Sequence, residues 1–217
     1  VAIVTGAGRG PGRAHAHALA RHGARIVVND LDPNAAKAVC AEIRGSGGDA
    51  LANSASVQDM ALVEAMVAEA IARWGRVDIL VNNAGLLRDK TFAKIDLADF
   101  RLVLDVHLMG SVHCTRAVWQ HMRDRGYGRV IFTTSSSGLY GNFGQSAYSA
   151  AKMALVGLMQ TLALEGARYG IHVNCLAPSA FTAMTDGLLS QEDLAVLGAE
   201  RVSPAVVALA SEGAPTK

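Results

Sequence analysis

The sequence predicts an α/β protein built on a doubly wound parallel sheet, in a single domain that spans residues 1–217. Short β-branched runs alternate along the chain with helical patterns of about 10–20 residues, as a parallel sheet covered on both faces requires. The chain is long enough to bury a large core, and it contains no linker, repeat or low-complexity segment that would divide it.

The first unit of this pattern is a strand, a glycine-rich turn, a helix and a second strand. VAIVT leads into GAGRGPG, RAHAHALARHG has helical spacing, and ARIVVND ends on Asp30. Gly6, Gly10 and Gly12 permit a tight turn and let the amides of a helix N-terminus approach a pyrophosphate. Because an acid follows 18 residues after Gly12, at the end of the next strand, the unit favours a dinucleotide-binding Rossmann fold.

Asp30 and Arg9 bear on which dinucleotide would bind. The carboxylate of Asp30 is expected to accept hydrogen bonds from the adenosine ribose, and its charge would repel a 2′-phosphate, so NAD is favoured over NADP. Arg9 favours the opposite, because a base in this turn can meet such a phosphate. The alternative for Asp30 is a turn or N-cap acid before DPNAAKAV.

The later elements follow the same alternation. A long helical region is expected from Leu97 to about Asp124, and a tail rich in Leu and Ala indicates two short helices within GLLSQEDLAVLGAERVSPAVVALASEG. The other expected elements are a helix at 34–44, a strand at 49–53, a helix at 57–74, a strand at 77–82, a strand at 129–134, a helix around YSAAK and a strand at 171–178.

Composition excludes several classes of function. A net charge of +1 gives no basis for attraction to nucleic acid or membrane, no apolar stretch reaches spanning length, and no signal-peptide pattern is present. Seven histidines lack the spacing of a metal site, so no metal is expected. Cys40, Cys114 and Cys175 are odd in number and far apart, which indicates buried free thiols in a reducing, cytoplasmic compartment.

Tyr148 and Lys152 form the clearest candidate for catalysis. They lie four residues apart in a helical segment, AYSAAKMALVGLMQTLALEG, and therefore on one helical face. A free phenol titrates near pH ~10, and a neighbouring cation favours its ionised form, so such a phenol can exchange a proton with an alcohol or ketone. Ser135, at the end of RVIFTTS, is placed to hold the substrate oxygen. The alternative is a surface tyrosine and a solvated lysine.

The motifs TGAGRGPG, NNAG and YSAAK together resemble the short-chain dehydrogenase/reductase family, in the right order over essentially the whole chain. The resemblance implies hydride transfer between a nicotinamide and a carbon that bears oxygen, in which Ser135 orients the substrate and Tyr148 transfers the proton. It implies that Lys152 lowers the pKa of Tyr148 and holds the nicotinamide ribose. The residues implied in binding the cofactor are Gly6, Arg9, Gly10, Gly12, Asp30, Asn83, Ala84, Gly85, Tyr148, Lys152, Pro178 and Thr182, with Thr185 as a rival for Thr182.

The sequence departs from the family pattern at four places. His107 replaces an asparagine whose main-chain carbonyl anchors a water of the proton relay; the alternative is a histidine that fills a helix kink. Pro11 removes an amide donor to the pyrophosphate, at a cost on the order of 1–3 kcal/mol of binding. Ser56–Val57 replaces an aspartate–valine pair, which places an adenine contact in doubt. The family's closing seventh strand is expected to be absent from this chain.

The stretches LRDKTF, VHLMGS and LYGNFGQSAYSAAK resemble one branch of the family, the (3R)-hydroxyacyl-CoA dehydrogenase domains of multifunctional β-oxidation enzymes. The implied substrate is a secondary alcohol or ketone such as a 3-hydroxyacyl thioester. Tyr140, Asn142, Phe143 and Gln145 are expected to line its pocket; alternatively they form a rigid turn in which the two aromatic rings are core. An NADPH-dependent 3-oxoacyl reductase and a non-catalytic dinucleotide sensor are the competing functions.

A homodimer or homotetramer is expected, with a small-molecule substrate and without nucleic acid or membrane. The helical region of residues 97–124 and the helix of Tyr148 carry small and apolar residues on more than one face, including Ala150, Ala154, Gly157 and Leu158. A helix that is apolar around most of its circumference needs a second partner, and the family commonly pairs these helices between subunits.

Overall fold

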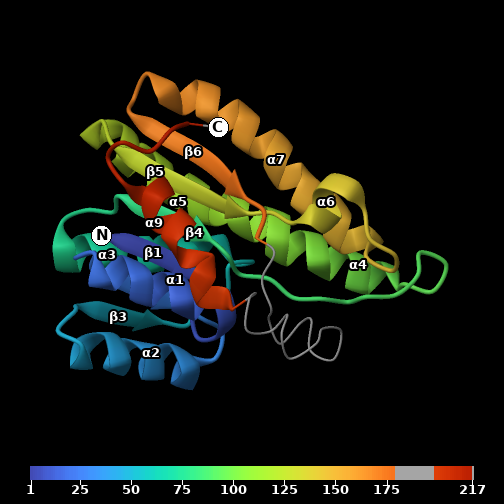
Figure 1. Ribbon diagram of the computed structural model, residues 1–217, viewed down its shortest axis with the longest axis horizontal. Coiled ribbons are helices and arrows are strands. Elements are labelled where there is room, and N and C mark those ends of the chain that lie inside the picture. Colours follow the sequence, from blue (N-terminus) through green and yellow to red (C-terminus); the bar gives the residue numbers. More distant parts are fainter. Residues whose placement is uncertain (179–197, 217) are drawn as a thin grey trace.

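A computed structural model describes residues 1–178 and 198–216, which form one six-stranded parallel sheet with helices on both faces (Figure 1). The strands lie in the order β3-β2-β1-β4-β5-β6, so the chain starts in the middle, builds one half outward and returns to build the other. This confirms the predicted doubly wound sheet.

The described elements alternate along the chain as expected. The strands are β1 (Ala2–Thr5), β2 (Ile26–Asn29), β3 (Ala50–Asn53), β4 (Ile79–Asn82), β5 (Gly128–Thr133) and β6 (Ile171–Leu176). The helices are α1 (Gly10–Arg21), α2 (Pro33–Gly45), α3 (Met60–Trp74), α4 (Leu97–Leu104), the π-helical turn η1 (Asp105–Met109), α5 (Gly110–Arg125), α6 (Ser136–Tyr140), α7 (Ser146–Ala167), the 3₁₀ turn η2 (Ala199–Arg201) and α9 (Ser203–Ala210).

The two faces of the sheet carry separate cores, because successive strand residues point to opposite sides. In β1, Ala2 and Val4 pack with residues of α1, α2 and α9, whereas Ile3 joins the core formed with α3, α5 and α7. Most strand positions are buried, and the central strands β1, β2, β4 and β5 carry runs of buried apolar residues, as expected for a parallel sheet between two helical layers. Figure 1 shows α2 beside β3 at one end of the sheet and α7 beside β6 at the other.

Most differences from the predicted boundaries have local causes. Helix α3 begins at Met60 and not at residue 57, because the carboxylate of Asp59 caps the amides of Ala61 and Leu62. The predicted long helical region of residues 97–124 is confirmed, and within it α4, the π turn η1 and α5 follow one another without a break. Helix α6 was not predicted; its N-cap is Ser135.

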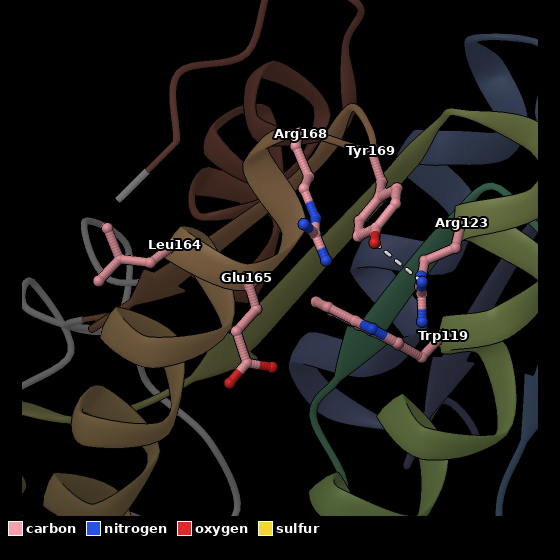
Figure 2. Close-up of a pocket in the computed structure, with 6 residues that line it drawn as sticks. All are labelled: Trp119, Arg123, Leu164, Glu165, Arg168 and Tyr169. Carbon is pink, nitrogen blue, oxygen red and sulfur yellow. Dashed lines mark hydrogen bonds between the residues drawn. The ribbon is translucent and has the colours of Figure 1, made fainter.

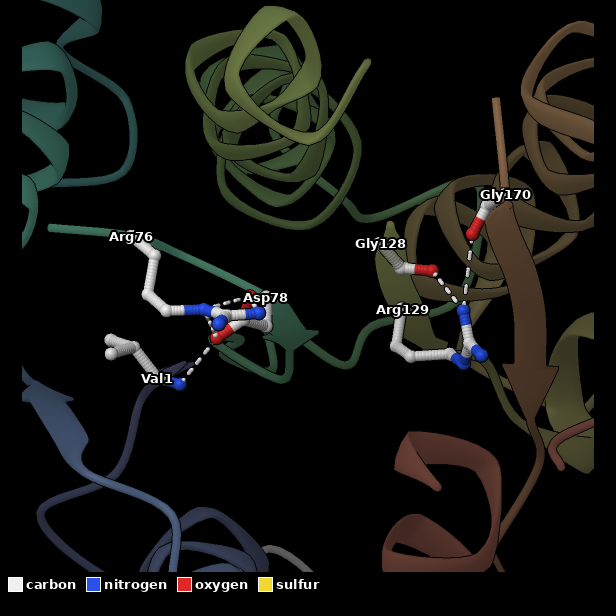
Figure 3. Close-up of polar contacts among 6 residues, drawn as sticks. All are labelled: Val1, Arg76, Asp78, Gly128, Arg129 and Gly170. Atoms are coloured by element: carbon white, nitrogen blue, oxygen red, sulfur yellow. Dashed lines mark hydrogen bonds and ion pairs between the residues drawn. The ribbon is translucent and has the colours of Figure 1, made fainter. Parts of the chain in front are cut away.

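The tail after β6 is fastened to the sheet through Arg129. Its buried guanidinium donates to the carbonyl oxygens of Gly128, Gly170, Ser211 and Glu212 at 2.8–3.1 Å; Figure 3 shows the first two bonds. In the same view, the carboxylate of Asp78 binds the nitrogen of Val1 and the guanidinium of Arg76 (Figure 3). Helix α9 confirms one of the two predicted tail helices, and residues 198–216 contain no strand; the other predicted tail helix falls mainly outside the described residues.

Cys40 and Cys114 are buried and free, as predicted, but Cys175 is only partly buried, so its predicted full burial is wrong. The part of the chain that the structure describes holds no group of three or more metal-ligating side chains. Within the same part, α7 is long and apolar enough to cross a membrane by length and composition, which corrects the sequence interpretation that no stretch reaches that length. It packs against β6 as a layer of the domain, and 33% of its most apolar window is buried.

Candidate active site

The predicted site residues gather at the carboxyl ends of β1, β2, β4 and β5. Parallel strands end at the same edge of a sheet, and the strand order reverses between β1 and β4, where β1 pairs with both β2 and β4. The loops after these strands diverge there, and this point is the usual ligand site of a doubly wound sheet.

The glycine turn after β1 is shaped by the close approach of other backbone. Gly6 has a φ of +62°, and a Cβ there would lie 2.9 Å from the Cα of Ala84. A Cβ at Gly12 would collide with the carbonyl of Gly6 and lie 2.6 Å from the side-chain nitrogen of Asn83. Only glycine fits both positions. The first turn of α1 contains no acidic residue, so its amides suit an anion, with Pro11 contributing none.

Thr5 joins this turn to the NNAG segment after β4. Its hydroxyl oxygen accepts hydrogen bonds from the amides of Asn83 and Ala84, each at 3.0 Å, and the side chain of Asn83 donates to the carbonyl oxygens of Thr5 and Gly6 at 3.0 and 3.2 Å. The two segments predicted to hold a dinucleotide are therefore one hydrogen-bonded unit. Thr5 was recognised in the sequence only as part of the turn motif.

Asp30 lies directly after β2 on the rim of the glycine turn. One carboxylate oxygen accepts from the amide of Gly8 at 2.9 Å and the other from the amide of Asp32 at 3.0 Å. Asp32 caps α2, so the N-cap alternative for Asp30 is wrong, whereas its bond to the amide of Asp32 fits the alternative of a turn acid. Arg9 is 73% exposed and forms an ion pair with Asp32 at 3.5 Å. The glycine turn and the start of α1, which has no acidic side chain, fit the phosphates of a dinucleotide, and the carboxylate of Asp30 beside the turn fits its ribose.

Ser135, Tyr148 and Lys152 come together beside the end of β5. Ser135 caps α6 with its hydroxyl and lies close enough to the phenol of Tyr148 to lower its pKa. The ammonium of Lys152 lies 5.5 Å from the centroid of the Tyr148 ring and donates to the carbonyl of Thr133 at 2.5 Å. Thr134 donates from its hydroxyl to the carbonyl of Lys152 at 2.6 Å, so both ends of this lysine are fixed to β5. The alternative of a surface tyrosine and a solvated lysine is wrong, because Lys152 is 3% exposed.

The pKa of Tyr148 is raised, which contradicts the prediction that Lys152 lowers it. Burial is the main cause; the Ser135 hydroxyl lowers the pKa, and the negative charge of Asp89 raises it. Burial lowers the pKa of Lys152 itself to about 7, so only about half of these side chains carry a positive charge at pH 7. The phenol is therefore protonated at neutral pH in this arrangement.

His107 lies in the π turn η1 with its ring buried against Tyr148. The two rings meet edge to face with centroids 5.1 Å apart, and Nε2 lies 2.7 Å from the carbonyl oxygen and 3.0 Å from the amide of Leu86. Gly85 leaves room for the ring, since a Cβ there would collide with it. Burial, with the nearby Lys152, lowers the pKa of His107 to about 3, so the imidazole is neutral. The alternative of a histidine that fills a helix kink matches its position, and its ring also touches the candidate catalytic phenol.

The predicted substrate residues precede α7 at the mouth of the site. Tyr140 and Phe143 are 87% and 89% exposed, so the alternative of two core rings is wrong. The side-chain amide of Asn142 donates to Gln145 at 3.0 Å, and that of Gln145 donates to Asp89 at 2.7 Å. Asp89, within LRDKTF, was not singled out from the sequence, where no local pattern links it to a residue 56 positions away. Pro178 lies just beyond β6, and Thr182 and Thr185 lie outside the described residues.

With this geometry in place, comparison with known proteins decides the family. The model of the short chain dehydrogenase family matches residues 1–193 of the chain. The chain belongs to this family. Short-chain dehydrogenases are oxidoreductases that use a nicotinamide dinucleotide, and the cradle at Gly6 and Gly12 fits that group.

Individual relatives narrow the resemblance. Mouse peroxisomal multifunctional enzyme type 2 is 46% identical over 221 residues, covering 98% of this chain and 30% of the mouse protein. The peroxisomal hydratase-dehydrogenase-epimerase of Saccharomyces cerevisiae is 48% identical over 221 residues, covering 98% of this chain and 24% of the yeast protein. The chain thus spans less than a third of the length of these curated relatives. They confirm its resemblance to the dehydrogenase domains of multifunctional enzymes.

A solved structure of the same family supports the fold. A 7α-hydroxysteroid dehydrogenase complexed with NADH and 7-oxo glycochenodeoxycholic acid superposes with a TM-score of 0.90 at 31% identity. The match covers 97% of this chain and 87% of that chain. The doubly wound architecture is therefore that of a short-chain dehydrogenase.

The buried lysine generates a prediction about stability. The pKa of Lys152 is about 7 in the folded protein, against ~10.4 for a free lysine. Between these values the unfolded chain binds more protons, so this group makes the free energy of unfolding rise with pH from about 7 to about 10. We expect Lys152→Met to remove that rise, so that its stability relative to wild type is greatest below pH 7 and falls towards pH 10. Urea unfolding followed by tryptophan fluorescence at several pH values measures this.

Lys37→Met, at an exposed position of α2, is the matched control and should give no such trend. Stability curves of wild type and Lys152→Met that run parallel from pH 6 to 10 would show that Lys152 is not held as a buried, easily deprotonated amine.

Proposed function

We propose that the chain interconverts a secondary alcohol and its ketone with NAD, with Tyr148 as the acid/base and a 3-hydroxyacyl thioester as the substrate class. The observation that carries the proposal is that Ser135 and Lys152 meet Tyr148 at the end of β5, at the same sheet edge as the dinucleotide cradle. The substrate class rests on the names of the mouse and yeast relatives.

Each residue has a separate task in this mechanism. The dinucleotide, when bound, supplies or accepts the hydride. The hydroxyl of Ser135 orients the substrate oxygen beside the phenol. During oxidation Tyr148 takes the hydroxyl proton at its phenolic oxygen, and during reduction it returns that proton. Lys152 fixes the helix against β5 and holds the nicotinamide ribose.

His107 acts as a positioning residue in this scheme. Its neutral ring lies edge-on to Tyr148 and limits where the phenol can lie. Its carbonyl oxygen, predicted to anchor a water, accepts the hydroxyl of Ser111 at 2.7 Å.

The reductase alternative has two specific observations in its favour. A phenol with a raised pKa is protonated at pH 7, which is the form that donates a proton to a ketone. The exposed Arg9 beside the ribose position would suit a 2′-phosphate. We favour NAD because the amide of Gly8 holds the carboxylate of Asp30 on the rim of the glycine turn at 2.9 Å, whereas the side chain of Arg9 is 73% exposed.

The acid/base assignment gives a pH-dependent prediction. Oxidation needs the phenolate, so its rate should rise about tenfold per pH unit across the neutral range. Reduction needs the phenol and should change little there. Tyr148→Phe should lower both rates at least about 1,000-fold. The assay follows NADH absorbance with 3-hydroxybutyryl- and acetoacetyl-coenzyme A from pH 6 to 9.

NADH binding by Tyr148→Phe, measured from quenching of tryptophan fluorescence, is the control and should stay within a few-fold of wild type. A wild-type protein that binds NADH but reacts with neither substrate would support the non-catalytic sensor and overturn this proposal. An oxidation rate that is flat with pH would remove Tyr148 as the base.

Asp30 generates the cofactor prediction. Wild type should bind NADH at least about tenfold more tightly than NADPH, because a 2′-phosphate would meet the carboxylate. Asp30→Ala should remove most of that preference by weakening NADH binding. Fluorescence titration of both dinucleotides measures it, with Asp59→Ala, a cap on the distant helix α3, as the control. Tighter binding of NADPH by wild type would favour the reductase.

We infer that α7 and α5 also form the contact of a homodimer. The buried side of α7 faces the sheet, whereas Ala150, Met153, Gly157 and Leu164 follow one another at helical spacing on its exposed side. Met153 and Leu164 are 49% and 70% exposed, and nothing lies within 4 Å of a Cβ added at Gly157. Such a stripe allows close approach of another helix, which a helix with two apolar faces requires.

The end of this stripe offers charges that a second copy can match. A hollow of about 470 Å³ lies between the ends of α5 and α7, lined by Trp119, Arg123, Leu164, Glu165, Arg168 and Tyr169 (Figure 2). Arg123 donates to the hydroxyl of Tyr169 at 2.9 Å. Because the hollow carries both Glu165 and arginines, two copies related by a two-fold axis can pair opposite charges across it.

The dimer predicts a change in mass on substitution of the stripe. Wild type should sediment as a dimer or tetramer at micromolar concentration, and Met153→Glu/Leu164→Glu should sediment as a monomer, because a dimer would bury four new carboxylates. Lys37→Glu on the exposed face of α2 is the control. A wild-type monomer at this concentration would overturn the proposal.

The cytoplasmic location stays a prediction, because the mouse and yeast relatives are peroxisomal by name.

A further inference from the structure

We propose that Asp89 is a positioning residue of the active site, whose carboxylate anchors Gln145 and so holds the loop before α7 against the loop after β4. This inference rests on the proposed function for its kinetic consequences. It assigns a role to a residue outside the Ser135, Tyr148 and Lys152 group.

The two loops meet through two adjacent contacts. The amide of Lys90 donates to the carbonyl of Gly144 at 2.9 Å. Beside it, the side-chain amide of Gln145 donates to Asp89 at 2.7 Å, and its oxygen accepts from Asn142 at 3.0 Å. Both ends of the Gln145 amide are therefore used, and Asp89 is the group that ties this pair to another part of the chain.

The position of Gln145 makes this bond relevant to catalysis. Gln145 is the N-cap residue of α7 but makes no cap bond with its side chain, so the side chain is held from outside the helix. Its carbonyl accepts from the amide of Ser149 at 2.7 Å, in the first turn that contains Tyr148. A shift of this residue would therefore move the start of the helix that carries the phenol, together with the exposed Phe143 at the mouth.

The neighbours of Asp89 leave it free for this task. Arg88 and Lys90 both form ion pairs with Asp99 on α4, at 3.4 and 3.3 Å. These pairs fasten the loop after β4 from the other side. Their partner is Asp99, and Asp89 binds the neutral amide of Gln145 instead.

Asp89 also contributes charge to the surroundings of Tyr148. The groups that surround the phenol are Lys152 on its own helix, neutral His107 from η1, Ser135 from the end of β5, and Asp89 from the loop after β4. Cys175 of β6 affects Lys152. Of these, the carboxylate of Asp89 favours the protonated phenol. Position and charge can be separated, because Asn keeps the acceptor oxygen of Asp and loses its charge.

The experiment compares Asp89→Ala, Asp89→Asn, Gln145→Ala and the double variant Asp89→Ala/Gln145→Ala in the oxidation of 3-hydroxybutyryl-coenzyme A. Asp89→Ala and Gln145→Ala should each raise KM about fivefold, Asp89→Asn should stay within about twofold of wild type, and the double variant should be no worse than either single one. The pH profile should divide the variants differently. The pH range over which the oxidation rate rises should move to lower pH in both Asp89 variants and stay in place in Gln145→Ala.

Hydrogen–deuterium exchange of residues 139–149 supplies a readout that does not depend on activity. Exchange should accelerate in Asp89→Ala and Gln145→Ala, and match wild type in Asp89→Asn. A wild type without activity but with this pattern would reject the proposed function and retain the anchor. Exchange unchanged in Asp89→Ala, Asp89→Asn as impaired in KM as Asp89→Ala, or additive effects in the double variant would overturn the anchor.

Discussion

The burial of the Lys152 ammonium is the constraint on which the rest of the site depends. Removing an ammonium from water is unfavourable unless polar groups replace the water, and here one carbonyl oxygen, that of Thr133, receives it. The lowering of its pKa to about 7 reflects the free-energy cost of this burial. The fold tolerates it because β5 and α7 are fixed to each other at two points, through Thr133 and Thr134. A looser junction would let the ammonium turn to solvent.

Several other features follow from this junction. Helix α7 must lie close to the end of β5. Helix α6 fits beside them because residue 138 is a glycine, since a Cβ there would collide with Lys152. Ser135, at the start of α6, is thereby directed at Tyr148 one turn before the lysine. On the opposite side the ring of His107 fills the space under the phenol, and the π turn η1 admits a side chain there that a regular helix would direct elsewhere. The buried lysine therefore lowers the stability of the fold, as is common where function needs a buried charge.

The parts of the site that the sequence predicts are those set by local rules. The glycine turn, Asp30 at the end of β2 and the spacing of Tyr148 and Lys152 depend on neighbours a few residues away or on the alternation of strands and helices. The bond between Asp89 and Gln145, the π turn and the short helix α6 depend on which loops the folded sheet brings together, and no periodicity encodes them. The predicted direction of the shift in the pKa of Tyr148 was wrong for the same reason. Helical spacing gives the distance between two side chains, but burial of both decides which charges exist.

Helix α7 couples the site to the outer surface of the protein. Its inner face carries Tyr148 and Lys152, and its outer stripe of Ala150, Met153, Gly157 and Leu164 is shielded little by the rest of the chain. A second copy on that stripe would press the helix against β5 and β6 and stabilise the junction that holds the buried ammonium. Because both faces belong to one rigid helix, any contact that restrains the outer face also restrains the phenol. Assembly and catalysis in this chain are therefore expected to share one structural element, whose amino end is held by the bond between Gln145 and Asp89.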